Sequence, residues 1–131
     1  MKKKKQIAVI DDDVLFLEVF EELTRDGDYN YEFYSNGVQF LEACKHIQYD
    51  LIITDVDIPE MPADLIISRL NKEDILASTP VLLCSGTIDD KRVLEIIEKG
   101  KSALAIDYIE KPFNIKMLLN KAKILLRLRD L

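Results

Sequence analysis

The chain has 131 residues, of which 48% are hydrophobic and 32% charged, and its net charge is −6. This length suits one domain with a hydrophobic core and is too short for a catalytic domain beside an output domain. Nucleic-acid phosphates require a basic surface, so the acidic balance predicts no direct nucleic-acid binding. No apolar run approaches the roughly 20 residues that span a bilayer, so we expect no membrane segment and a cytoplasmic location.

The chain begins with basic residues, and we interpret residues 1–5 as a solvated tail. The apolar run that follows, Ile7–Ile10, is too short for the hydrophobic region of a signal peptide and stops at three aspartates. Cys44 and Cys84 are too few for a disulfide framework, and we expect both to be small buried side chains. His46 lies in a polar stretch and is expected on the surface.

The first half of the chain alternates between strand-like and helix-like hydrophobic patterns. Ile7–Ile10 predicts a buried strand, and a helix follows because apolar residues then recur at i, i+3, i+4 and i+7. A second short strand is expected at Tyr31–Tyr34, and Asn36-Gly37 opens a second helix. The apolar faces predicted for these helices hold Phe16, Val19, Phe20 and Leu23 in the first, and Phe40, Leu41 and Cys44 in the second.

The second half continues the alternation, which predicts βαβ units and a parallel sheet with helices on both faces. Strands are expected at Leu51–Asp55, at Val81–Cys84 after Thr79-Pro80, and at Ala105–Ile109. A helix from about Asp89 is expected between the last two strands. The apolar faces predicted for the helices of this half hold Ala63, Ile66, Ile67 and Leu70, then Val93, Ile96 and Ile97, then Ile115, Leu118, Leu119, Ala122, Leu125 and Leu126.

Four of the predicted strands end at residues suited to phosphoryl chemistry. These are the run Asp11–Asp13, Asp55, Ser85 and, two residues past the last strand, Lys111. The carboxyl ends of neighbouring parallel strands meet at one edge of a sheet, where open α/β sheets bind ligands. Crowded carboxylates repel one another and require a hard divalent cation, so the pattern predicts a Mg²⁺ site, with Mn²⁺ as the alternative metal.

Each of these residues also has a plainer interpretation. The run Asp11–Asp13 suits the N-terminus of the following helix, and we expect Asp13 to cap it. Asp55, Ser85 and Lys111 could each be ordinary residues at the end of a strand or in a loop. Their joint occurrence at four strand ends favours a shared site.

The chain resembles the receiver domain of response regulators, the phosphoacceptor half of two-component signalling, over essentially its whole length. The motifs that carry the resemblance are VIDDD at Val9–Asp13, LIITDVDIPEM at Leu51–Met61, Cys84-Ser85-Gly86, and YIEKPF at Tyr108–Phe113. The resemblance implies an α/β, flavodoxin-like doubly wound (βα)5 fold with a five-stranded parallel sheet in the order 2-1-3-4-5. Residues 6–131 would then form a single receiver domain with no output domain.

The resemblance also implies a role for each acid of the site. Asp55 would be the phosphoacceptor and a Mg²⁺ ligand. Asp12 would be a second ligand, and Asp11 would act directly or through water. Asp57 would contribute its backbone carbonyl to the metal.

Three further residues take roles from the same resemblance. The Ser85 hydroxyl would bond one phosphoryl oxygen and the Lys111 ammonium another. Tyr108, which we expect to be at least partly a core residue, would swing into the space that Ser85 leaves. The last two helices and the last strand would then present a changed surface.

The implied function is that of a phosphoacceptor signalling domain and not of an enzyme with other substrates, since it catalyses only its own phosphorylation and dephosphorylation. A histidine kinase or a phosphotransfer protein would donate the phosphoryl group. A downstream protein, or a second copy forming a homodimer, would dock on the face of the last two helices and the last strand. Both a stand-alone regulator and a fragment of a longer protein fit this description.

Two other functions stay open at this point. Asp55-Val56-Asp57 after an apolar strand also resembles the first motif of haloacid-dehalogenase-type phosphatases, although Ile58-Pro59 departs from that motif. The other alternative is a receiver-like module that binds partners without phosphorylation, but the full set of site residues is present, which favours phosphorylation.

Three features depart from the family pattern. Ala63 occupies a position where the family commonly has glycine. Asp57 places another acid beside the phosphosite, and we hypothesise that it alters the dephosphorylation rate by orienting or repelling water. The stretch Gly100–Tyr108 is longer than usual, and Leu104 continues a helical face, so we expect either an extended helix or a bulged loop there.

Overall fold

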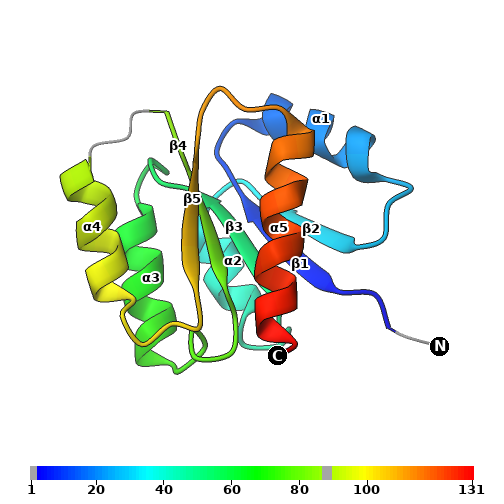
Figure 1. The fold of residues 1–131 in the computed structure, drawn as a ribbon. Helices are drawn as coiled ribbons and strands as arrows, with labels where there is room; N and C mark the ends of the chain where they lie inside the picture. Colours follow the sequence, from blue (N-terminus) through cyan, green and yellow to red (C-terminus); the bar gives the residue numbers. More distant parts are fainter. Residues whose placement is uncertain (1–2, 87–89) are drawn as a thin grey trace.

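A computed structural model describes residues 3–86 and 90–131 of the chain (Figure 1). Within these residues five strands alternate with five helices. In chain order they are β1 (Gln6–Ile10), α1 (Val14–Thr24), β2 (Asn30–Tyr34), α2 (Gly37–Ala43), β3 (Leu51–Asp55), α3 (Ala63–Lys72), β4 (Val81–Ser85), α4 (Asp90–Lys99), β5 (Ile106–Glu110) and α5 (Ile115–Arg129).

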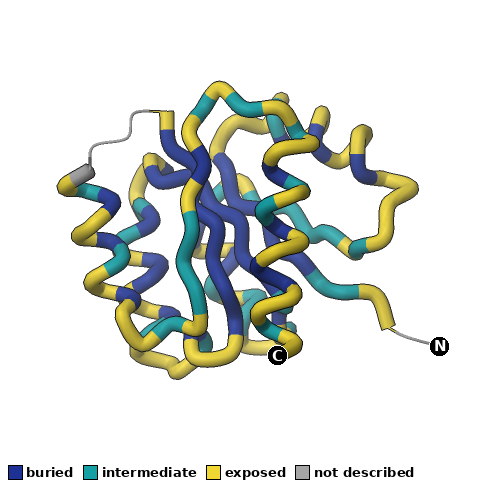
Figure 2. The backbone as a smooth tube through the Cα atoms, viewed as in Figure 1, coloured by how far each residue is buried: buried dark blue, intermediate teal, exposed yellow. Residues whose placement is uncertain are grey.

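The strands form one parallel sheet in the order β2-β1-β3-β4-β5, which confirms the predicted topology. Helices α1 and α5 cover one face, and α2, α3 and α4 cover the other (Figure 1). Alternation along β1 shows why, because Ile7 and Val9 join the core under α1 and α5, while Ala8 and Ile10 join the opposite core. The central strands are accordingly buried on both sides, whereas β2 and β5 form the edges (Figure 2).

The buried face of α1 differs from the predicted one. Phe20 is buried as expected, but Leu17 and Thr24 share its stripe, while Val19 and Leu23 are 47% and 62% exposed. Two apolar stripes lie side by side on this helix, and spacing alone cannot say which of them faces the sheet. Docking against β1 and β2 selects the stripe that contains Leu17 and Phe20.

The lengthened stretch after α4 is a loop and not a helical extension. Helix α4 ends at Lys99, and the backbone N–H of Leu104 donates to the Leu76 carbonyl at 2.8 Å, which holds the loop against the segment between α3 and β4. Gly100 lies where a Cβ atom would come within 2.6 Å of the Ile106 side chain and 3.0 Å of Ile67. The glycine therefore permits the close approach of α3, α4 and β5.

Ion pairs at the amino end of the sheet connect the starts of the strands to the end of α5. Lys5 contacts Asp130 at 2.8 Å, so the last residue of the expected tail is tied to the end of α5. The Arg129 guanidinium pairs with Asp50 at 3.0 Å and donates to the Ser78 carbonyl at 3.1 Å. Among the described helices, none is long and apolar enough to cross a membrane.

Candidate functional site

The three acids predicted at the strand ends come together at the carboxyl edge of the sheet. Asp11 follows β1 and is 2% exposed, Asp55 ends β3 and is 8% exposed, and Asp12 faces solvent. One carboxylate oxygen of each lies within 4.8 Å of the others. Parallel strands bring their carboxyl ends to one edge, so residues 44 positions apart share a single cluster.

Lys111 reaches into this cluster from the loop after β5. Its Nζ lies 3.2 Å from Asp11 Oδ2 and 3.5 Å from Asp55 Oδ1. The backbone N–H of Lys111 donates to the Ser85 carbonyl at 2.7 Å, which extends the pairing of β5 with β4 and fixes where the lysine side chain begins. Burial alone would lower the pKa of Lys111, but the charges of Asp11 and Asp55 raise it overall.

The electrostatics of the cluster favour a bound cation. Burial raises the pKa of Asp55, the charge of Asp11 raises it further, and Lys111 opposes both effects. Among the described residues of the cluster, three carboxylates therefore face one ammonium. Clustered carboxylate oxygens, one of them on the solvent-facing Asp12, are the donor set that hard divalent cations prefer. The residues present thus fit a divalent metal.

The Asp11–Asp13 run also performs the predicted capping role. The Asp13 carboxylate accepts from the backbone N–H of Phe16 at 3.1 Å and caps α1. The backbone N–H of Asp13 in turn donates to Asp11 Oδ1 at 2.9 Å, which orients the Asp11 carboxylate toward Lys111. Capping and cluster formation therefore coexist in the same run.

Ser85 and Tyr108 lie on neighbouring strands but in different environments. Ser85 ends β4 beside the cluster and is 3% exposed. Tyr108 lies on the edge strand β5 and is 41% exposed, so the expectation of a partly buried core residue is not met. An edge strand has no neighbour to cover the outward side of such a ring, and Tyr108 lies at the surface.

The Asp57 carboxylate pairs with a residue of α4. It pairs with Nη1 of Arg92, on the first turn of α4, and Nη2 of the same guanidinium donates to the Val56 carbonyl at 3.3 Å. The loop after β3 is thus tied to the start of α4. Sequence analysis missed Arg92, since nothing in the local pattern shows which residue of α4 will face a loop 35 positions earlier.

Sequence analysis also missed Phe16. The Lys111 Nζ lies 5.6 Å from the centre of the Phe16 ring, within the range of a cation–π contact. The signal available in the sequence was an aromatic residue one helical turn after the acid run. The hydrophobic pattern of α1 led us to assign this residue to the core.

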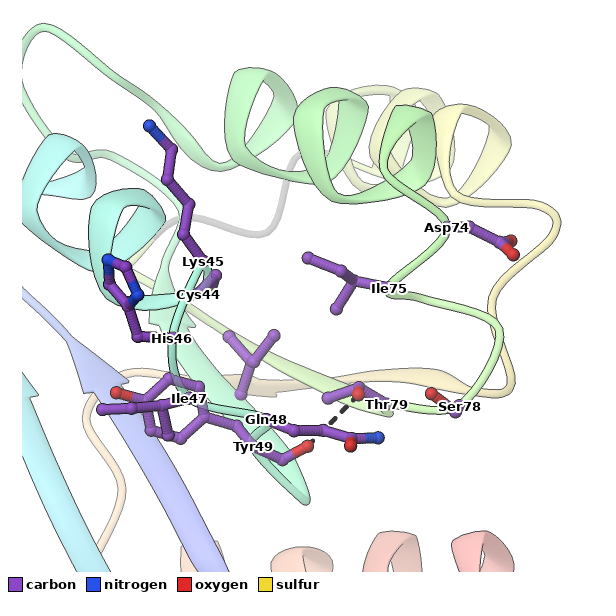
Figure 3. A pocket seen from close by; sticks show the side chains of 11 residues that line it. Cys44, Lys45, His46, Ile47, Gln48, Tyr49, Asp74, Ile75, Ser78 and Thr79 are labelled. Carbon is purple, nitrogen blue, oxygen red and sulfur yellow. Dashed lines mark hydrogen bonds between the residues drawn. The ribbon is translucent and has the colours of Figure 1, made fainter.

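A separate cavity of about 320 Å³ lies at the amino end of the sheet (Figure 3). Its lining includes Cys44, His46 and Thr79, and the Thr79 hydroxyl donates to the Tyr49 carbonyl at 3.2 Å. Burial raises the pKa of the Cys44 thiol to about 12, so the thiol is protonated at neutral pH. His46 is exposed, as predicted. None of the predicted site residues lines this cavity.

Comparisons with known proteins agree with this geometry. The family profile of the response regulator receiver domain matches residues 7–123. The chain is 30% identical over 112 residues to the transcriptional regulatory protein CrdR of Helicobacter pylori, covering 86% of this chain and 50% of that protein. It is 28% identical over 127 residues to RpaA, a DNA-binding dual master transcriptional regulator of Synechocystis, covering 95% and 50%. The chain therefore spans about half the length of these curated relatives.

The fold comparison points the same way. The signal receiver domain of an HD domain-containing protein from Pseudomonas fluorescens Pf-5 superimposes with a TM-score of 0.86 at 22% identity, covering 98% of both chains. Identity at this level supports the fold alone, but the family profile covers most of the sequence, and neither comparison favours a haloacid-dehalogenase phosphatase. On the agreement of profile, relatives and fold, the chain belongs to the response regulator receiver domain family, a signalling domain of two-component systems.

Proposed function

We propose that this receiver domain accepts a phosphoryl group on Asp55 from the phosphohistidine of a kinase or of a phosphotransfer protein. The observation that carries the proposal is the cluster of Asp11, Asp12 and Asp55 with the Lys111 ammonium among the acids. An Asp55 carboxylate oxygen attacks phosphorus, the new O–P bond forms as the P–N bond breaks, and the electron pair returns to the imidazole.

The same cluster is our proposed Mg²⁺ site, with Mn²⁺ as an alternative. Asp11, Asp12 and Asp55 would hold the metal through carboxylates and Asp57 through its backbone carbonyl, a set of oxygen donors that suits a hard cation. When bound, the metal neutralises negative charge on the transferring phosphoryl group. Because the Asp57 carboxylate is already paired with Arg92, only its carbonyl is assigned to the metal.

Lys111 and Ser85 would bind the transferred group. The Lys111 ammonium pairs with one phosphoryl oxygen, and the Ser85 hydroxyl donates to another. Movement of Ser85 opens space at the end of β4, and Tyr108, exposed on the neighbouring strand, is the aromatic residue proposed to move into it. Phosphorylation would shift the population between two packings of the surface formed by α4, β5 and α5.

That surface is our proposed docking site for a downstream protein or for a second copy of the chain. Tyr108 on β5 and Met117 and Leu128 on α5 expose apolar area there. The domain would act in the cytoplasm, without binding nucleic acid itself. It would act on no substrate other than its own phosphoryl group.

The test is intact mass spectrometry after incubation with acetyl phosphate and Mg²⁺. We expect one phosphoryl adduct on the wild type, none on Asp55→Asn, and none when a chelator removes the metal. Asp57→Asn is the matched control, since it removes an acid two positions away and should still accept the group. An absent adduct would indicate a phosphorylation-independent binding module, and turnover of small phosphomonoesters would indicate a phosphatase.

A further inference from the structure

The Lys111 ammonium is contacted from two directions. Asp11 and Asp55 approach it from the ends of β1 and β3, at 3.2 and 3.5 Å. The Phe16 ring approaches it from the first turn of α1, with the ring centre 5.6 Å from Nζ. The side chain of Lys111 is 30% exposed, so water screens these contacts only in part.

Phe16 also contacts the loop that carries Lys111. Its ring packs edge to face against Phe113, two residues after the lysine, with centres 6.0 Å apart and planes at 88°. It also packs edge to face against the fully buried Phe20, with ring centres 5.8 Å apart. One side chain of α1 thus connects the lysine and its loop to the core beneath α1.

The position of the lysine matters because its side chain has four flexible methylene groups and a compact charge. In the unphosphorylated protein the acids hold the ammonium. Once those acids engage other ligands, their pull on Lys111 weakens, whereas the face of an aromatic ring keeps its attraction for a cation. The Phe16 ring therefore restricts the conformations of the Lys111 side chain to those that keep the ammonium near the site.

We propose that Phe16 is a positioning residue that holds the Lys111 ammonium beside Asp55, ready for a phosphoryl oxygen. This inference rests on the proposed function and adds to it a contact from α1. It assigns to the ring face of Phe16 a role that an aliphatic side chain of similar size cannot fill.

The first test compares Phe16→Leu, which keeps an apolar side chain, with Phe16→Tyr, which keeps the ring. We expect Phe16→Leu to be phosphorylated by acetyl phosphate about two- to fivefold more slowly, the range that a partly exposed cation–π contact supplies. Phe16→Tyr should retain the wild-type rate. Leu15→Ala is the control, since it truncates the neighbouring exposed side chain of α1.

The second test observes the contact directly. In NMR spectra of the unphosphorylated protein, the Phe16 ring current should shift the Lys111 Hε protons upfield. The shift should be lost in Phe16→Leu and kept in Phe16→Tyr. A thermal melt of each variant monitors folding.

Three outcomes would overturn the proposal. They are an absent ring-current shift in the wild type, an unchanged rate in Phe16→Leu after loss of the shift, and a Phe16→Tyr variant as slow as Phe16→Leu. Wild-type protein that takes no phosphoryl group would contradict the proposed function itself, and the NMR result would still report on the contact between Phe16 and Lys111.

Discussion

The aspartates at the two ends of the sheet differ in how their charge is balanced. At the carboxyl end, the Lys111 ammonium pairs with Asp11 and Asp55, and among the described residues of the cluster it is the single cation beside three carboxylates, the third being Asp12. The negative charge there exceeds the positive charge, and one of the carboxylates faces solvent. Repulsion among these carboxylates disfavours their charged forms, so binding of a cation or a proton would stabilise this end.

At the amino end the charges are matched. Asp50 accepts from the backbone N–H of Gln6 at 2.7 Å and pairs with Arg129 at 3.0 Å, while Lys5 pairs with Asp130. Here the acids have a structural role, because they join the start of β1 and β3 to the end of α5. The contrast teaches that an aspartate at a strand end indicates a ligand site only where its charge is left uncompensated.

The largest effect is expected when one of the excess negative charges at the carboxyl end is removed. Asp12→Asn should weaken Mg²⁺ binding by about a hundredfold, the upper end of what loss of even an outer-shell partner costs a metal site. The dependence of the thermal midpoint on Mg²⁺ concentration measures it. Asp50→Asn, which removes the same charge from the amino end, should leave Mg²⁺ affinity unchanged, and an equal loss in both variants would contradict the assignment.

The next largest effect is expected when one of the paired charges at the amino end is removed. Arg129→Gln leaves the half-buried Asp50 carboxylate without its cation, and we expect a loss of about 1 to 2 kcal/mol in the free energy of unfolding. Urea denaturation gives this value. Mg²⁺ affinity should not change, and a large change would show that the two ends are coupled.

A smaller effect, of opposite sign, is expected at Asp55 in the metal-free protein. Burial raises the pKa of Asp55, so the ionised carboxylate destabilises the fold at neutral pH. Asp55→Asn should therefore stabilise the metal-free protein by on the order of 1 kcal/mol, with Lys111 still paired to Asp11.

The pH dependence of this gain follows from the sign of the shift. The penalty of the charge develops as pH rises from the ordinary pKa of 3.8 through the raised pKa of the folded state. The advantage of Asp55→Asn should grow as pH rises through that interval, reach its full size above the raised pKa and vanish below the ordinary value. Denaturation curves of both proteins across this range test it, and a constant difference would contradict the origin in ionisation.

The smallest effect on stability is expected at Asp57. Its pair with Arg92 is exposed, so Asp57→Asn should change the free energy of unfolding by no more than about 0.5 kcal/mol. In Asp57→Asn we expect the phosphoryl group on Asp55 to last a few times longer, roughly the effect of one lost polar contact. The substitution removes a carboxylate that can orient water, and it releases the Arg92 guanidinium. Decay of the phosphorylated species by mass spectrometry measures the lifetime. A shorter lifetime would favour repulsion of water, and an unchanged one would remove the hypothesis.

Much of the site was predictable because it depends on the ends of strands. Asp11, Asp55 and Ser85 follow directly on apolar runs, and a parallel sheet brings such positions to one edge whatever the details of packing. Tyr108 shows where this reasoning stops. Its strand and the place of that strand at the sheet edge were predicted, but the exposure of the ring depends on which elements pack beside β5, and none covers that side of Tyr108.

The sequence by itself determined the order of elements, the two cores and the edge at which the acids gather, since alternation along each strand and helical spacing are properties of short segments. The tertiary structure alone decided the contacts of Phe16 with Lys111 and of Arg92 with Asp57, and the choice of Leu17 over Val19 for the buried face of α1. These features depend on how each helix is rotated about its axis against the sheet. That rotation is set by packing between segments far apart in the chain, and no local pattern contains it.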